Sequence, residues 1–130
     1  MKRISFETAK AISHIYKEYT TKAYSSTGEL IEPYYGGKYH NFEDDNGDCV
    51  YAAPYQAQLQ EWLRNEHGVS VLVYLDETLS YFWIITNLNT RASLTEYHGP
   101  EKVQCKHYET CLEDGLRAAL HLLWHAGWRR

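Results

Sequence analysis

Residues 43–48, EDDNGD, have the composition of a cation-binding loop. Ca²⁺ takes several oxygen ligands, and a bent acidic segment can supply them. The spacing does not follow the EF-hand pattern, because aligning Gly47 with the glycine of that pattern places Phe42 at the first ligand position. We therefore predict no metal ligands in this loop and expect a solvated acidic turn.

Cysteine and histidine side chains gather before and inside the start of the last predicted helix. Cys105, His107 and Cys111 offer three soft ligands, whereas structural zinc takes four ligands with closely paired spacing. Cys49 or a distant histidine would have to complete the set, so ordinary reduced cysteines are the favoured interpretation. An odd number of cysteines fits thiols in a reducing cytoplasm. We expect neither a metal nor another cofactor.

His121 and His125 stand one helical turn apart, a spacing at which two imidazoles can chelate one ion. Helical geometry places both of them opposite Leu112 and Leu116, on the outer face of the predicted helix. The favoured interpretation is therefore a pair of solvated histidines.

A glycine-rich and tyrosine-rich segment precedes the acidic run. His40, Asp44 and Asp45 could act together as acids or bases in a cleft. The chain has no nucleophile elbow, no glycine-rich phosphate loop and no His-Glu-x-x-His helix. We therefore predict no catalytic residues and favour a protein that is not an enzyme.

The same segment offers a second possibility, the binding of a small molecule. Tyr34, Tyr35 and Tyr39 could stack on a flat ring, such as that of a nucleotide-like ligand, with His40 beside them. The competing interpretation is a loop that folds over the sheet and contributes its tyrosines to the core. Both interpretations of loop 34–48 stay open at this point.

Aromatic side chains are frequent, with twelve Tyr and four Trp among 130 residues. Trp124 and Trp128 lie on either side of the end of the last predicted helix, and Trp124 is at the edge of its apolar stripe. An aromatic surface there would suit a protein partner or self-association. These two tryptophans, with exposed residues of the strands, are the candidate interaction surface.

The formal net charge of −4 argues against a protein that holds phosphate backbones, so we expect no nucleic-acid partner. No stretch approaches the ~20 apolar residues that a membrane span requires. Met1-Lys2-Arg3 leads into an amphipathic pattern in place of a signal peptide. We therefore expect a cytoplasmic protein without membrane contact.

The apolar periodicity predicts a single domain, 1–130, of the α+β class. It has three helices and an antiparallel sheet of roughly four or five strands, and its C-terminal part follows the order α-β-β-(β)-α. The predicted helices cover Phe6 to about Glu18, a segment from Pro54 to His67, and a segment that Gly127 ends. The predicted strands are Tyr19–Tyr24, Glu29–Tyr35, Val69–Leu75, Leu79–Thr86, Leu94–Tyr97 and Lys102–His107.

Two resemblances accompany these patterns. The order of elements from Pro54 to Trp124 resembles the double-stranded-RNA-binding domain in topology. That family opens its last helix with lysines, whereas the matching positions here begin with Glu109 and continue through Glu113 and Asp114. The resemblance therefore concerns topology and does not change the expectation that nucleic acid is not a partner.

Four phrases of the chain are similar to those of a family of small uncharacterised proteins of gut-anaerobe bacteria and their phage-like mobile elements. They are ISFETAK at 4–10, GELIEPYYGG at 28–37, APYQAQLQEWLRNEHGV at 53–69 and YETCLEDGLRAALHLL at 108–123. The resemblance implies one intact domain and a bacterial or phage-like, cytoplasmic origin. The family has no assigned activity, so it implies no functional residues.

Abundant aromatics and the lack of catalytic signatures favour a non-enzymatic accessory or protein-interaction module, with a protein partner or a homo-oligomer as its complex. The alternative is a small-molecule binding protein that uses the Tyr/His loop 34–48.

Overall fold

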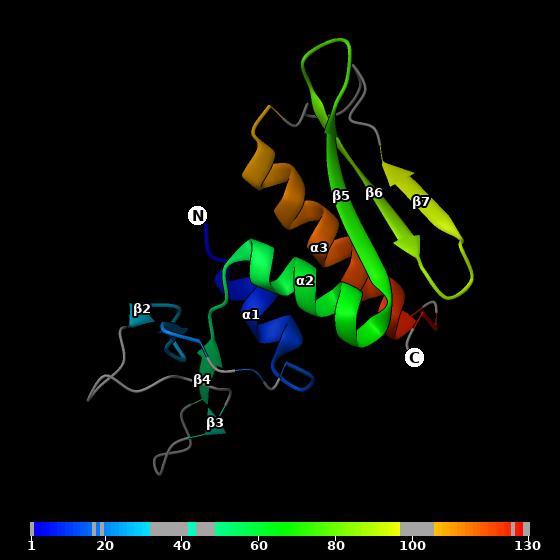
Figure 1. The fold of residues 1–130 in the computed structure, drawn as a ribbon. Helices are drawn as coiled ribbons and strands as arrows, with labels where there is room; N and C mark the ends of the chain where they lie inside the picture. Colours follow the sequence, from blue (N-terminus) through cyan, green and yellow to red (C-terminus); the bar gives the residue numbers. More distant parts are fainter. Residues whose placement is uncertain are drawn as a thin grey trace. The chain divides into compact units, whose positions relative to one another are not determined.

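The computed structural model describes residues 2–16, 18, 20–31, 42–43, 49–96, 106–125 and 127–128. The chain divides into two compact units, residues 1–55 and 56–130. The α+β class and the three helices are confirmed. The antiparallel strands form two sheets in place of the single sheet that we expected (Figure 1).

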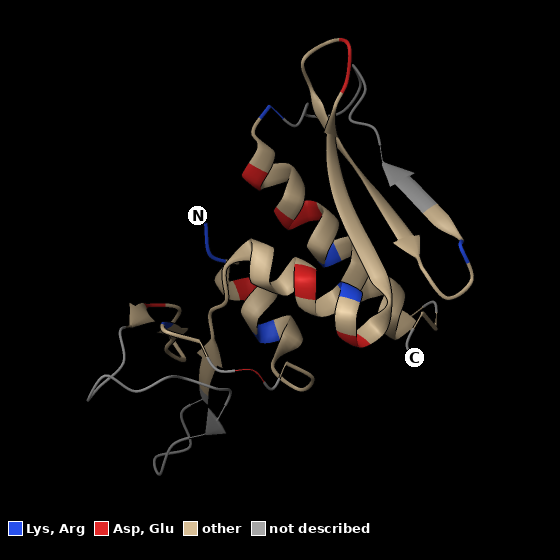
Figure 2. Ribbon diagram, viewed as in Figure 1, with Lys and Arg blue, Asp and Glu red and all other residues tan. Residues whose placement is uncertain are grey.

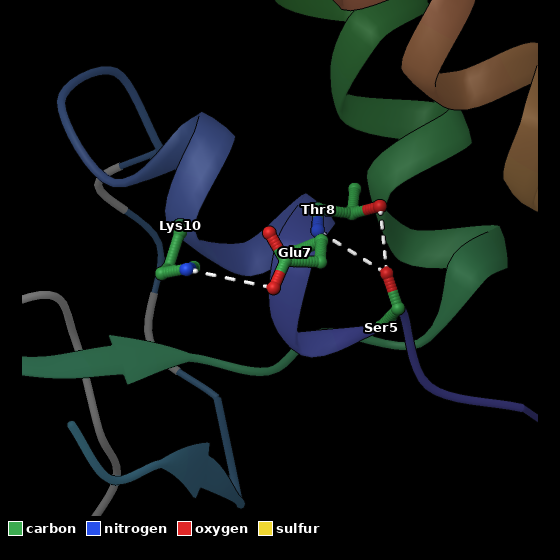
Figure 3. Close-up of polar contacts among 4 residues, drawn as sticks. All are labelled: Ser5, Glu7, Thr8 and Lys10. Atoms are coloured by element: carbon green, nitrogen blue, oxygen red, sulfur yellow. Dashed lines mark hydrogen bonds and ion pairs between the residues drawn. The ribbon is translucent and has the colours of Figure 1, made fainter. Parts of the chain in front are cut away.

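The first unit begins with helix α1 (Phe6–Ile12), capped by Ser5 as its sequence predicts. The Ser5 hydroxyl accepts a hydrogen bond of 3.2 Å from the backbone N–H of Thr8 and lies 3.0 Å from the Thr8 hydroxyl. Glu7 and Lys10 form an exposed ion pair of 3.5 Å on the same turn (Figure 3). The cap satisfies one of the N–H groups that every helix start leaves without a partner.

Helix α1 is shorter than the predicted segment, which continued to about Glu18. Its last helical residue is Ile12. The backbone N–H and the hydroxyl of Ser13 both donate to Lys10 O, at 3.2 Å and 2.8 Å. Local bonds of this kind compete with the next helical turn, and the apolar spacing that continues to Tyr16 does not reveal them.

The sheet of the first unit has the strand order β2-β1-β4-β3, with every described pair antiparallel. The turn predicted at residues 25–28 joins β1 to β2, and Gly28 adopts a φ of 90° there. The ring of Phe6 contacts the rings of Tyr24 and Tyr51, with centroids 5.6 Å and 5.9 Å apart. The strands are β1 (Ala23–Tyr24), β2 (Leu30–Ile31), β3 (Phe42–Glu43) and β4 (Cys49–Ala52).

The second unit has the order α-β-β-β-α, as the sequence predicts for this part of the chain. Its sheet has the order β5-β6-β7, so β6, which is apolar on both faces, is the central strand. The predicted strand at residues 102–107 falls mostly outside the described residues. The elements are α2 (Gln56–His67), β5 (Val69–Leu75), β6 (Tyr81–Asn87), β7 (Ser93–Glu96) and α3 (Tyr108–His125).

Helix α3 packs on one face of this sheet at Gly115. A Cβ atom on Gly115 would lie 3.0 Å from Val71 Cγ1 and 3.1 Å from both Cβ and Cγ of Trp83. The buried indole of Trp83 donates a hydrogen bond of 2.8 Å from Nε1 to Asp114 Oδ2. The missing side chain of Gly115 therefore lets the helix backbone approach the sheet, and the adjacent carboxylate satisfies the only polar atom of the indole.

Glutamine side chains of helix α2 form hydrogen bonds with α3 and with β5. Gln56 is buried and donates from Nε2 to Glu109 O at 2.9 Å and to Glu113 Oε1 at 3.0 Å. One turn later, Gln60 Nε2 donates to the backbone carbonyl of Val71 on β5. The start of α2 is thus held beside the start of α3, and Gln60 links α2 to the backbone of β5.

We expect Gly115→Val to lower the free energy of unfolding by about 1–3 kcal/mol, because the added methyl groups must displace Val71 and Trp83 from a close-packed contact. Arg117→Val is the matched control, since Arg117 is exposed on the same helix and only its helix propensity changes, by less than about 0.5 kcal/mol. Urea unfolding measures the free energy of unfolding of both variants, and the comparison applies where their m-values equal that of the parent protein. Equal losses in the two variants would contradict the role of Gly115 as a close contact.

Candidate functional site

The β5–β6 hairpin presents a second face, turned away from α3. Side chains opposite each other across an antiparallel pair share a face. Val71 and Val73, opposite Ile85 and Trp83, share the face that α3 covers. The alternate pairs of the same register therefore lie on the other face. They are Ser70 with Thr86, Leu72 with Ile84, and Tyr74 with Phe82.

Apolar side chains are concentrated at the far end of this hairpin. Four of the eight large hydrophobic side chains that are exposed in the described ranges fall within residues 72–79. Leu72 is 42% exposed, Tyr74 44%, Leu75 52% and Leu79 73%. The rings of Tyr74 and Phe82 stack with centroids 5.7 Å apart and planes at 26°. We call this apolar end of the hairpin the hairpin surface; it comprises Leu72, Tyr74 and Phe82 on the face turned away from α3, Leu75 on the other face, and Leu79 at the turn that joins the two strands.

The end of the hairpin is apolar on its helix-facing side as well. Leu75 lies opposite Tyr81, and the ring of Tyr81 meets the ring of Tyr108, the first residue of α3, edge to face at 5.9 Å. Figure 1 shows the β5–β6 turn extending beyond the start of α3. The strand pair is therefore longer than its helical cover, and this is the reason that Leu75 is exposed while Val71 is buried.

Leu79 occupies a position that ordinarily suits glycine. Leu79 N donates to Asp76 O at 3.1 Å and Asp76 N donates to Ser80 O at 2.9 Å, and Leu79 itself has a φ of 61°. Three-residue hairpin loops place glycine at such a left-handed position, since a side chain is strained there. The chain thus holds a large apolar side chain at the tip of the hairpin at a cost in stability.

Asp76 organises the turn that carries Leu79. Its Oδ1 accepts hydrogen bonds from Thr78 Oγ1 at 2.7 Å, Thr78 N at 2.8 Å and Ser80 N at 3.0 Å. The bond from the Thr78 hydroxyl, followed by those from the backbone of Ser80 and Thr78, lowers the pKa of Asp76. The ionised carboxylate is therefore the form that fixes the tip of the hairpin.

Charged side chains are absent from β5 and β6, as the uniform tan colour of both strands in Figure 2 shows. Acidic residues appear only at the turn, where Asp76 and Glu77 stand at the rim of the hairpin surface. Glu77 is exposed. An apolar centre with a charged rim is the usual composition of a protein–protein contact surface.

Sequence reasoning found the hairpin but misplaced Leu79. It assigned Leu79 to the second strand, which in fact begins at Tyr81, because the turn bonds of Asp76 include Leu79. The missed signal was the position of an apolar residue directly after Asp76-Glu77-Thr78, where a short hairpin loop requires positive φ. The alternation of the strand also predicts one buried face made of Val69, Val71, Val73 and Leu75; Val69 and Val71 are buried, whereas Val73 is half-buried and Leu75 is exposed.

The predicted ligand-binding residues Tyr34, Tyr35, Tyr39 and His40 all lie outside the described residues. The same holds for most of the acidic loop 43–48, of which only the backbone of Glu43 is described, in β3. The structure therefore adds nothing to the small-molecule interpretation of loop 34–48.

The two tryptophans predicted as an interaction surface lie at the end of α3. Trp124 is exposed at 38%, whereas Trp128 is half-buried. Trp128 N donates to Leu122 O at 3.2 Å, and Gly127 between them has a φ of 73°. The acceptor lies one residue before the carbonyl that a Schellman cap would use, so the helix ends in a left-handed Gly127 with a wider turn that brings Trp128 back over the last turn of α3.

The candidate metal ligands are only partly described. Cys111 is a buried free cysteine and His107 is exposed, while Cys105 lies outside the described residues. His121 and His125 are both exposed, as predicted from helical geometry. Within the described part of the chain, no group of three or more His, Cys, Asp or Glu side chains could hold a metal ion.

Comparison with known proteins gives no relative from which a role could be transferred. No protein-family model, no curated protein and no solved structure matches the chain. Among the helices in the described ranges, none is long and apolar enough to span a membrane.

We expect Leu79→Gly to raise the free energy of unfolding by about 1 kcal/mol, because glycine adopts positive φ without strain and an exposed leucine loses little packing. Glu77→Gly, at an exposed position of the same turn with ordinary φ, is the control and should destabilise the protein. Thermal unfolding of both variants measures the difference. A loss of stability in Leu79→Gly would show that Leu79 contributes contacts that outweigh its strain.

Asp76→Ala should lower the Tm at pH 7, and the gap to the parent protein should close in acid. The folded pKa of Asp76 lies below its ordinary value of 3.8. Its stabilising effect is therefore complete above pH 3.8 and is lost as the pH falls through the lower, folded pKa. Melting curves of parent, Asp76→Ala and the control Glu77→Ala between pH 7 and pH 2 measure this. A gap for Asp76→Ala that stays constant over that range would contradict the role of the carboxylate.

Proposed function

We propose that this protein is a non-enzymatic protein-interaction module whose contact surface is the hairpin surface. The observation that carries the proposal is the concentration of exposed large hydrophobic side chains within residues 72–79. The bacterial or phage-like origin and the cytoplasmic location expected from the sequence belong to this proposal.

The energetics favour a contact surface over a solvated one. Each Å² of apolar area removed from water contributes about 25 cal/mol, so leucine and tyrosine side chains that are close to half exposed leave stabilisation unused in the isolated chain. Stacking of Tyr74 on Phe82 orders both rings before a partner arrives. Less conformational entropy is then lost on binding, which favours association.

The backbone strain at Leu79 supports the same function. A left-handed φ at a residue other than glycine persists only where the surroundings enforce it, and such residues cluster at functional sites. Glycine would relieve the strain at the tip, but it would also remove the most exposed large hydrophobic side chain in the described residues. Leucine at this position therefore fits a contact with a partner better than it fits the stability of the isolated chain.

The chemistry of the surface indicates the partner. Its centre carries no charge, and Asp76 and Glu77 stand at its rim. A complementary surface would be apolar with a basic residue at the edge that meets Glu77. Rim charges act mainly on association rate and salt dependence, whereas the apolar centre determines affinity.

The test uses site-specific photo-crosslinking in the protein's natural host. We expect a photoreactive phenylalanine analogue placed at Tyr74 to give a covalent adduct with a partner, either another protein or a second copy of this chain. The same analogue at Leu88 is the matched control, since Leu88 is an exposed leucine in the β6–β7 turn, away from the hairpin surface. Sedimentation of the purified chain separately measures self-association.

A second variant tests whether the adduct depends on apolar contact. Leu79→Asp should reduce the adduct formed at Tyr74 by at least tenfold, because it replaces the most exposed apolar side chain of the hairpin surface by a charge, whereas Leu88→Asp should not. Circular dichroism confirms that both variants fold. Equal adduct yields at Tyr74 and Leu88, or an adduct at Tyr74 that Leu79→Asp leaves unchanged, would contradict the proposal.

A further inference from the structure

The end of α3 carries two imidazole rings on its solvent-exposed side. His121 and His125 are both exposed, and their ring centroids lie 4.4 Å apart with the planes at 32°. They share one face because α3 continues as a regular helix through His125. The pair is independent of the hairpin surface and of the function proposed for it.

The separation of the rings fits two ligands of one metal ion. A metal–nitrogen bond of about 2.0–2.1 Å and a centre-to-nitrogen distance of about 1.1 Å in imidazole put two cis ligands at about 90° roughly 4.5 Å apart, centroid to centroid. Ligands at the tetrahedral angle would be about 5.1 Å apart on the same bond lengths. The observed 4.4 Å agrees with the cis arrangement.

We infer that His121 and His125 form a two-imidazole site for a divalent transition-metal ion, with Cu²⁺ preferred over Ni²⁺ and Zn²⁺. Square-planar and tetragonal geometry, with ligands at right angles, is typical of Cu²⁺ and Ni²⁺, whereas Zn²⁺ favours the tetrahedron. In the proposed site, each exposed ring rotates about its Cβ–Cγ bond, which leaves the centroid nearly in place, until one nitrogen faces the ion. Water fills the remaining positions, because the described part of the chain offers no third ligand there.

The helix itself adds a favourable field. His121 and His125 lie in the last two turns of α3, where the carbonyl end of the helix carries a partial negative charge that favours a bound cation. Arg117 stands one turn before His121 and opposes this effect. Since Arg117 is exposed, solvent screens its charge, and chelation by two nitrogens provides the affinity.

Binding of CuCl₂ to the untagged, ¹⁵N-labelled full chain tests the site. We expect paramagnetic broadening centred on the backbone signals of residues 121–125 and on the indole N–H of Trp124, which lies between the two ligands in sequence. His121→Ala and His125→Ala should each raise the Kd for Cu²⁺ at least tenfold, because one imidazole cannot chelate. The control is His107→Ala, an exposed single histidine that directly precedes the first residue of the same helix, which should leave the Kd unchanged.

The expected order of affinity, Cu²⁺ above Ni²⁺ and Ni²⁺ above or equal to Zn²⁺, is measured by titration calorimetry on the same samples. A Kd that changes less than threefold in both His121→Ala and His125→Ala would overturn the site. So would broadening centred elsewhere on the chain, or a Zn²⁺ affinity above that of Cu²⁺. Retained binding in His107→Ala combined with loss in the other two variants would establish it.

Discussion

The second unit depends on the contact between the backbone of α3 at Gly115 and the side chains of Val71 and Trp83. The helix can approach the sheet because residue 115 has no side chain, and the approach brings Asp114 within 2.8 Å of the Trp83 indole nitrogen. Burial of the indole and satisfaction of its N–H thus follow from one close approach. A side chain at this position would force Val71 and Trp83 to move away from the helix.

The same contact determines which part of the hairpin is left uncovered. Helix α3 begins at Tyr108, and beyond that level the strand pair continues to a turn held by Asp76. Leu75 and Leu79 therefore extend past the helical cover, while the opposite face exposes Leu72 and Tyr74. A hairpin longer than its supporting helix converts residues of a core-forming type into a surface. The exposure of Leu75 and Leu79 is a consequence of this mismatch in length, whereas Leu72 and Tyr74 are exposed because they lie on the face that α3 does not cover.

The two proposed sites lie at opposite ends of α3. Its 18 residues span about 27 Å at 1.5 Å per residue, with Tyr108 near the hairpin turn and His121 and His125 at the other end. A side chain changed at one end has no shared partner with the other, so effects on partner binding and metal binding should be additive. The experiments on one site therefore do not test the proposal for the other.

The sequence by itself determined the local structure wherever neighbouring residues decide it. The cap at Ser5, the strand Val69–Leu75 and the end of α3 before Gly127 follow from side-chain hydrogen bonding, period-two apolarity and glycine's tolerance of positive φ, so all three were predictable. The early end of α1 after Ile12 was not, because the apolar spacing continues past the Ser13 bonds that end it. Only the tertiary structure decided which face α3 covers and how far the cover extends: α3 begins at Tyr108, so Leu75 is exposed although it shares a face with the buried Val71, and no periodicity within the strand records this.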